Sequence, residues 1–189
     1  DFPMLKELNL DFNEPKSFKF LANLPRLEIL SLEQTGFEDM RLLNHLKNLK
    51  ALNVSKNELT HVNEFTNVEH LEAFDGKFCQ LTDVSFLEHA HKLLKLNLYT
   101  NRITSIDCLK KCREIEDLNV ARNQIHSISC LKDMKSLKIL SLENNNISDL
   151  KPLEDCKELC IVDLYNNNIS DLKPLSGLEW VSYLRLDHN

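Results

Sequence analysis

Leucine, isoleucine and valine recur along this chain with a period of 22 residues and no insertion. Three apolar columns in each unit follow the spacing L-x-x-L-x-L. The first column reads Leu5, Leu27, Leu49, Leu71, Leu93, Ile115, Leu137, Leu159 and Val181. The second reads Leu8, Leu30, Leu52, Phe74, Leu96, Leu118, Leu140, Val162 and Leu184. The third reads Leu10, Leu32, Val54, Gly76, Leu98, Val120, Leu142, Leu164 and Leu186. The pattern contains eight full units from Met4 and the strand of a ninth.

Each unit carries the signals of one short strand and one short turn. The alternation at Leu8 and Leu10 predicts a strand with both side chains inward. Beyond the strand, apolar columns three residues apart favour short 3₁₀ turns over long helices. Pro152 and Pro174 fall in these turns, where a missing backbone N–H is tolerated. One unit cannot bury its apolar side alone, so neighbouring units are expected to stack with their strands in parallel.

A polar column follows the strand of every unit. It reads Asn13, Thr35, Asn57, Cys79, Asn101, Asn123, Asn145, Asn167 and Asn189. A buried corner leaves backbone groups without strand partners, and an amide side chain both donates and accepts hydrogen bonds. We therefore expect stacked asparagines to bond the corners of adjacent coils. Gly76 stands in a column of larger apolar residues, and Phe74 and Phe78 are expected to fill the missing volume.

The complete unit reads L-x-x-L-x-L-x-x-N/C-x-L, and the decapeptide NNNISDLKPL occurs at both 144–153 and 166–175. Over essentially its whole length the chain resembles the leucine-rich repeat family. Its 22-residue unit is similar to those of internalins and of the leucine-rich-repeat regulator of protein phosphatase type 1. The resemblance implies an α/β solenoid, a right-handed superhelix with a concave parallel β-sheet and convex short 3₁₀ or helical turns.

The extent of the repeat sets the expected domain organisation. No shift in composition marks a boundary, so we expect residues 1–189 to form a single leucine-rich-repeat domain. The chain opens on Asp1 without an initiator methionine and stops within the pattern at Asn189. We therefore expect it to be a piece of a longer protein.

Charge and hydropathy narrow the range of partners. A formal net charge of −6 argues against nucleic acid, because nucleic acids attract basic surfaces. No apolar run approaches the roughly 20 residues that a membrane-spanning helix needs, so membrane insertion is not expected. We expect a monomer that binds a protein partner.

The six cysteines are scattered through the units rather than closely spaced. Cys112 and Cys156 occupy an apolar column, where cysteine acts as a small hydrophobic residue. Cys108 and Cys130 share a column in adjacent units, so a disulfide between them is one alternative. Free thiols, the second alternative, suit a reducing compartment. The expected localisation is cytoplasmic, with an extracellular surface as the alternative.

The sequence contains none of the short motifs that carry common enzymatic chemistry. It has no Gly-rich phosphate loop, no H-E-x-x-H, no G-x-S-x-G and no C-x-x-C. His89 and His91 lie two residues apart at a coil edge, where solvent-exposed histidines are expected rather than metal ligands. We therefore expect no enzyme activity, no cofactor and no metal.

Outward-facing strand positions are the candidate binding surface. Ile139, Ile161 and Tyr183 are expected on consecutive coils about 5 Å apart, and charged residues surround them. Apolar and aromatic anchors inside a charged rim are typical of protein-binding hot spots. The candidate partner-binding residues are Tyr99, Ile139, Glu143, Ile161, Asp163, Tyr165 and Tyr183.

This apolar and aromatic patch is also compatible with two roles that involve no partner protein. Isoleucine and tyrosine favour strands in any case, and a cap or neighbouring domain beyond Asn189 would also cover apolar residues. The resemblance to the phosphatase regulator, which binds through concave aromatic and acidic residues, supports Tyr165, Tyr183, Glu143 and Asp163 as candidates.

Three functional hypotheses follow. The first is an adaptor or regulatory module that recognises a protein through its concave face, and unpaired cysteines favour it. The second is a surface adhesin of internalin type, which the strict 22-residue period favours and the six cysteines disfavour. The third is the recognition arm of a larger enzyme.

Overall fold

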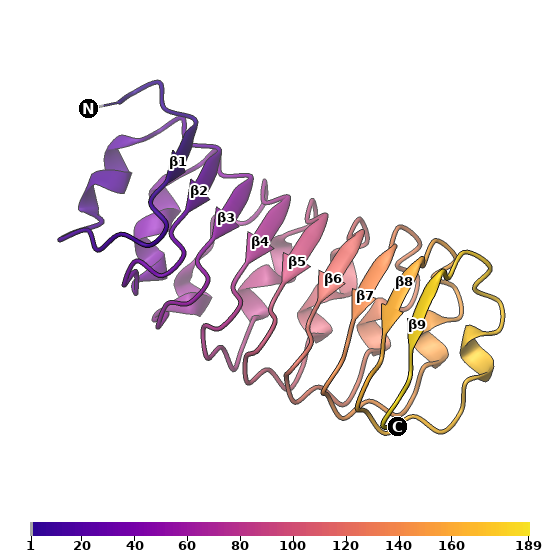
Figure 1. Cartoon of the computed structure of the whole chain (residues 1–189). Coiled ribbons are helices and arrows are strands. Elements are labelled where there is room, and N and C mark those ends of the chain that lie inside the picture. Colours follow the sequence, from indigo (N-terminus) through magenta and orange to yellow (C-terminus); the bar gives the residue numbers. More distant parts are fainter. Residues whose placement is uncertain (1) are drawn as a thin grey trace.

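Parallel strands in sequence order form the backbone of this fold. The computed structural model describes residues 2–189 and joins nine strands into one open sheet, β1 to β9 (Figure 1). The strands are β1 (Glu7–Asn9), β2 (Ile29–Ser31), β3 (Ala51–Asn53), β4 (Ala73–Asp75), β5 (Lys95–Asn97), β6 (Asp117–Asn119), β7 (Ile139–Ser141), β8 (Ile161–Asp163) and β9 (Tyr183–Arg185). Each pair is shifted by one 22-residue unit, as when Leu118 lies beside Leu140. The predicted solenoid and its register are therefore confirmed.

Short 3₁₀ helices return the chain on the side opposite the sheet (Figure 1). They are η1 (Lys19–Asn23), η2 (Met40–His45), η3 (Val62–Glu64), η4 (Ser85–His89), η5 (Asp107–Lys111), η6 (Ser129–Leu131), η7 (Lys151–Leu153) and η8 (Lys173–Leu175). Pro152 and Pro174 lie in the first turn of η7 and η8, where the backbone N–H has no helical partner. The prediction of short 3₁₀ turns on the convex side is confirmed.

The apolar columns form one continuous core between the sheet and the 3₁₀ helices. Leu118 and Leu140 of the second column are fully buried, as are Ile103 and Ile125 on the convex side. No helix in residues 2–189 is both long and apolar enough to cross a membrane.

The asparagine column bonds the corners of neighbouring coils, as expected. The Asn123 side-chain amide nitrogen donates to the carbonyl oxygens of Val120 and Ala121 in its own coil, at 3.0 and 3.1 Å. The same nitrogen reaches the Leu98 carbonyl of the preceding coil, at 3.0 Å. The Asn123 side-chain oxygen accepts the backbone N–H of Ile103 at 3.0 Å. One buried side chain therefore satisfies backbone groups of two coils.

Thr35 and Cys79 replace asparagine in two coils and make fewer of these bonds. The Thr35 hydroxyl donates to the Leu32 carbonyl at 2.8 Å. The Cys79 thiol donates to the Val54 carbonyl of the preceding coil at 3.2 Å. Strand pairing continues through both coils without a break, because asparagines in the next coils still accept backbone N–H groups there.

The missing side chain at Gly76 is replaced by one phenylalanine rather than two. The buried Phe74 ring lies only 2.7 Å from the position where a Cβ on Gly76 would stand. The prediction for Phe78 was wrong, because this residue is exposed and packs edge-on against Tyr99, with ring centroids 5.4 Å apart. Phe78 belongs to a turn position with left-handed backbone, φ +57°.

That left-handed position recurs once in every coil and was not predicted. It lies one residue before the asparagine column and is occupied by Phe12, Gln34, Lys56, Phe78, Thr100, Arg122, Asn144, Asn166 and His188. Its φ values lie between 52° and 62°. Most side chains at this position are exposed, whereas Thr100 and Asn144 are half-buried. Only Asn144, Asn166 and His188 are of residue types that are enriched in such a conformation.

Replacing Asn145 by alanine tests the corner. The change removes the acceptor for the Ile125 N–H and the donor to the Val120 and Leu142 carbonyls, all buried. We expect the free energy of unfolding to fall by about 2–4 kcal/mol, since each unsatisfied buried group costs roughly 1–3 kcal/mol. Urea denaturation measures it. The control is Asn146→Ala, which alters an exposed neighbour, and equal losses in both variants would contradict the assignment.

Candidate functional site

The concave face consists of the outward side chains of the nine strands and of the residues directly after them. Ile139, Ile161 and Tyr183 occupy paired positions in β7, β8 and β9, as predicted. Ile139 is half-buried, whereas Ile161 is 38% and Tyr183 49% exposed. We call these three residues the apolar patch. Register alone brings them together, since residues 22 apart lie side by side.

Arg185 organises the charged residues beside this patch and was not predicted as a site residue. Its guanidinium lies 4.0 Å from the centroid of the Tyr165 ring. The same group is 3.7 Å from carboxylate oxygens of both Glu143 and Asp163. It also contacts Asp187 at 3.0 Å. One arginine therefore contacts all three carboxylates, which together keep a net negative charge, and it lies over the ring of Tyr165.

Tyr99 lies apart from the rest of the candidate residues. It follows β5, two coils before the unit that carries Glu143, and packs against Phe78. Arg122 connects the two regions, because its guanidinium lies 5.7 Å from the Tyr99 ring centroid and 3.6 Å from Glu143. The candidate residues thus form one group on β7–β9 and an outlying tyrosine.

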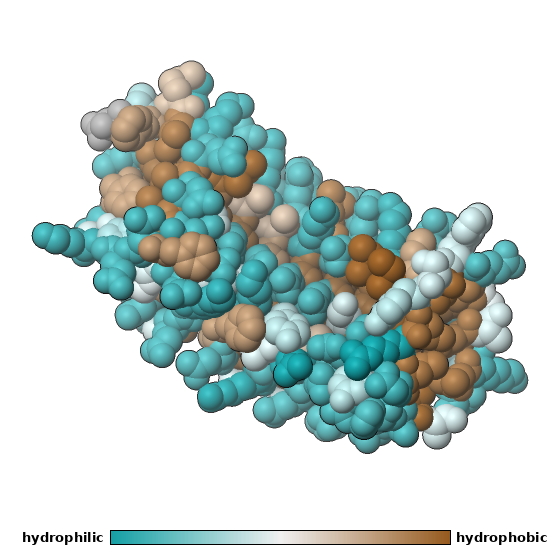
Figure 2. Space-filling model, viewed as in Figure 1, coloured by the Kyte–Doolittle hydropathy of each residue, from teal (hydrophilic) through white to brown (hydrophobic). Residues whose placement is uncertain are grey.

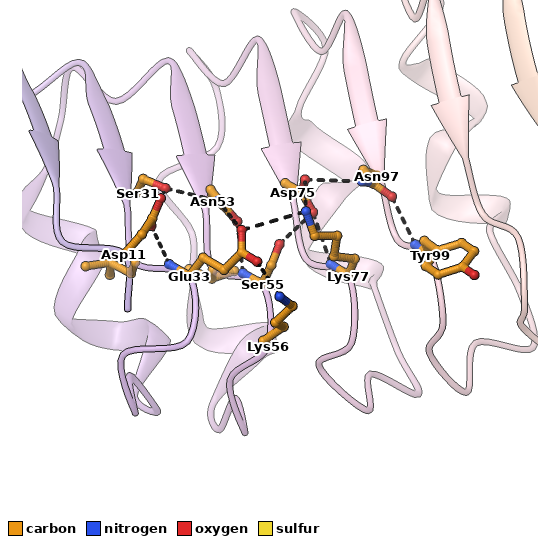
Figure 3. Close-up of polar contacts among 12 residues, drawn as sticks. Asp11, Ser31, Glu33, Asn53, Ser55, Lys56, Asp75, Lys77, Asn97 and Tyr99 are labelled. Atoms are coloured by element: carbon orange, nitrogen blue, oxygen red, sulfur yellow. Dashed lines mark hydrogen bonds and ion pairs between the residues drawn. The ribbon is translucent and has the colours of Figure 1, made fainter. Parts of the chain in front are cut away.

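A polar ladder runs along the middle of the concave face (Figure 3). Side-chain oxygens of strand-end residues accept the backbone N–H two residues later, which closes a small turn. These residues are Asn9, Asn53, Asp75, Asn97, Asn119 and Asp163. Lateral bonds join neighbouring coils, as when the Asn97 amide donates to Asp75 at 3.1 Å. These polar side chains therefore have a structural role.

A groove of about 430 Å³ lies over β2–β6, on the N-terminal side of the apolar patch. Its walls are polar residues of the ladder, and its floor is open because Ala51 and Ala73 carry small side chains. Ile29, 42% exposed, closes one end, and Asp117 lies at the opposite end. Two adjacent alanines in an outward column were the signal in the sequence, and the predicted site residues did not include them.

Asp117 is the titratable group of the groove whose surroundings are least favourable. It is half-buried, and burial raises the pKa of its carboxyl above the ordinary 3.8, with Lys95 on the neighbouring strand opposing the shift. Within residues 2–189 the Asp117 side chain forms no hydrogen bond or ion pair. It too was absent from the predicted site residues.

The cysteines and histidines were the remaining candidates for a disulfide or a metal site. All six cysteines are free, and burial raises the pKa of Cys108 and of Cys130 to about 12, so both stay protonated near neutral pH. His89 and His91 pack edge to face, with ring centroids 6.1 Å apart. In the described part of the chain no three His, Cys, Asp or Glu side chains are arranged to hold a metal ion.

Comparisons with known proteins agree with this architecture. A family model described as leucine-rich repeats in two copies matches residues 113–155. Comparison with curated protein sequences finds no match. Among solved structures, an internalin (InlF) from Listeria monocytogenes superposes with a TM-score of 0.87 and 22% identity, over 100% of this chain and 63% of that one.

Two further structures are similar. Internalin C2 from the same bacterium gives a TM-score of 0.69 and 25% identity, over 88% of this chain and 83% of that one. The plant peptide hormone receptor RGFR1, in complex with RGF2, gives a TM-score of 0.83 and 22% identity, over 95% of this chain and 31% of that one. The protein is therefore a leucine-rich repeat solenoid. Within that class it resembles the internalins, and it spans less than two thirds of InlF.

The uncompensated charge of Asp117 has a measurable effect on stability. A carboxyl whose pKa is raised in the folded state stabilises the fold below its ordinary pKa and loses that contribution as pH rises. Asp117→Asn should therefore raise the melting temperature at pH 7 but not near pH 3, where the native carboxyl is protonated. Calorimetry at the two pH values checks this, and a lower melting temperature of the variant at pH 7 would contradict it.

The polar ladder should also contribute to stability. Asn97→Ala removes the acceptor of the Tyr99 N–H and the donor to Asp75, so we expect a loss of about 0.5–1.5 kcal/mol. Ser141 occupies the same column and accepts no such bond among the described residues, so Ser141→Ala should stay within about 0.5 kcal/mol. Equal urea midpoints for the two variants would show that the ladder is only a surface feature.

Proposed function

We propose that this chain is a recognition module that binds a partner protein through its concave face. The observation that carries the proposal is the apolar patch, in which Ile161 and Tyr183 are exposed and Ile139 is half-buried, bordered by the charges around Arg185. Aromatic and aliphatic anchors that are fixed before binding lose little conformational entropy when a partner covers them. The groove beside the patch extends the same surface.

The space-filling view supports the choice of this face (Figure 2). Most of the visible surface is hydrophilic, and apolar side chains gather at the N-terminal end and again at the C-terminal end of the solenoid. Exposed apolar residues at the C-terminal end include Tyr183, Leu184, Leu172 and Trp180. Part of this apolar area lies on the last coil, beside β9, and not on the concave face. We therefore assign recognition to the concave face alone.

An adaptor or regulatory role is the form of this function that we favour. The groove and the patch hold polar, aliphatic and aromatic side chains, which suit binding better than bond-breaking chemistry. Free thiols with raised pKa values are in keeping with a reducing compartment such as the cytoplasm. The proposed partner is a protein, since a net charge of −6 disfavours nucleic acid.

Two alternatives have their own support. Similarity to InlF and internalin C2 favours a surface adhesin, although six cysteines disfavour it. Similarity to the plant peptide hormone receptor RGFR1 in complex with RGF2, of which this chain covers 31%, favours the recognition arm of a larger protein. Both alternatives are also recognition functions, so the test of the concave face bears on all three.

Charging the apolar patch tests the proposal. A chain with Ile161→Glu and Tyr183→Ala should lose its captured partner, because a buried glutamate would face apolar groups without a counter-charge. Affinity capture from native cells followed by calorimetry with the identified partner measures the loss. Thermal melting of the variant checks that the fold is intact.

The matched control is Phe20→Glu. Phe20 lies in η1 on the convex side and is 38% exposed, the same fraction as Ile161. This variant should keep the partner. Identical capture by the patch variant and the native chain would remove the concave patch from the proposal.

A further inference from the structure

Asp117 differs from its fellow half-buried acids on the concave face. Asp75 accepts bonds from Ser55, from the Lys77 backbone and from Asn97. Glu143 and Asp163 are held by arginine. Within residues 2–189 the Asp117 carboxylate has no bonded partner, although it lies in the same sheet and is partly withdrawn from water. A desolvated charge without a partner is costly to keep in a fold.

The position of Asp117 places this carboxylate between the groove over β2–β6 and the apolar patch. Lys95, Asp117 and Ile139 lie side by side on β5, β6 and β7. Ala73 and Ala51 continue the same column into the groove. Asp117 is thus the boundary between the open groove and the apolar patch, and a ligand that uses both surfaces must pass over it.

Lys95 does not neutralise this charge. It is exposed, and its amine makes no ion pair with the Asp117 carboxylate within 4.0 Å, although the two residues are paired in register. A long, flexible lysine can move aside at little cost when a partner approaches. The carboxylate therefore remains available to a cation from outside the chain.

We infer that Asp117 receives a lysine or arginine side chain from a partner protein, and that this residue is flanked by apolar side chains. The inference rests on the proposed function and names the chemistry of the partner. One flanking side chain would fill the groove above Ala51 and Ala73, and the second would lie on Ile139 and Ile161. The cation satisfies Asp117 while the apolar neighbours exclude water from the pair.

Spacing gives the expected sequence pattern of the partner. Ala73 and Ile139 are three strands apart, which is roughly 14 Å at about 4.8 Å per strand. An extended segment rises about 3.3 Å per residue, so roughly five residues span that distance. Alternate side chains of such a segment face the sheet, which predicts the pattern apolar-x-Lys/Arg-x-apolar.

A displayed library of random 12-residue peptides, selected on the immobilised whole chain, provides the probe. Enriched peptides should contain the predicted pattern. Synthetic versions are then measured by fluorescence anisotropy against the native chain and three variants: Asp117→Asn, Lys95→Ala, and the double variant Ile161→Glu with Tyr183→Ala. We expect affinity to fall at least tenfold with Asp117→Asn and with the double variant, and to stay equal or rise with Lys95→Ala.

The outcomes separate this inference from the proposed function. Peptides that lose affinity for the double variant but keep it for Asp117→Asn would overturn the role of Asp117 and leave concave recognition standing. Enrichment of acidic peptides whose affinity falls with Lys95→Ala would overturn the inference that the partner supplies a cation, and would show that Lys95 binds the partner instead. No enrichment, or affinity that no concave variant changes, would overturn both the inference and the proposed function. Thermal melting of each variant shows that lost affinity is not lost folding.

Discussion

Satisfaction of backbone polar groups at the corner after each strand is the interaction on which this structure depends. At that corner the chain leaves the sheet inside the core, where water cannot bond its N–H and C=O groups. Asn123, Asn145 and Asn167 each supply these bonds, and each reaches a carbonyl of the preceding coil. One coil is therefore completed only by the next, which makes stacking a condition of burial. Even the last side chain, Asn189, accepts the Ile169 N–H in this way.

This constraint explains why the fold could be predicted from the sequence. The residues of an apolar column face the same core, so the need for an apolar side chain recurs in every unit. One exception, such as Gly76, does not hide the pattern. The prediction for Phe78 was wrong because it did not take into account the column in which Phe78 lies. Phe74 belongs to an inward column, whereas Phe78 belongs to the left-handed turn, which directs its side chain outward. Both phenylalanines lie two residues from Gly76 in the sequence, but only the one in an inward-facing column fills the missing volume.

The candidate surface could be predicted only in part. Register placed Ile139, Ile161 and Tyr183 side by side because neighbouring strands fix their backbones. Arg185 and Arg122 were missed because long side chains cross from one coil to another, and their contacts depend on rotamers rather than on columns. The polar ladder was missed for a different reason. Its residues occupy outward positions that carry no core role in the sequence pattern, yet their side-chain oxygens accept backbone N–H groups of the turn after the strand.

Asp75 and Asp117 are both half-buried acids on the concave face, but only Asp75 is bonded by neighbouring side chains within residues 2–189. At Asp75 the surrounding serine, asparagine and lysine meet both carboxylate oxygens, so this face is able to neutralise a half-buried acid with its own side chains. At Asp117 the neighbours are Lys95, which is not bonded to it, and Ile139, which cannot bond. An asparagine there would lower the cost of desolvation and would lose only the attraction of Lys95. A charged residue at a position where a neutral one would be more stable is the arrangement expected of binding sites, where a partner supplies the missing interaction.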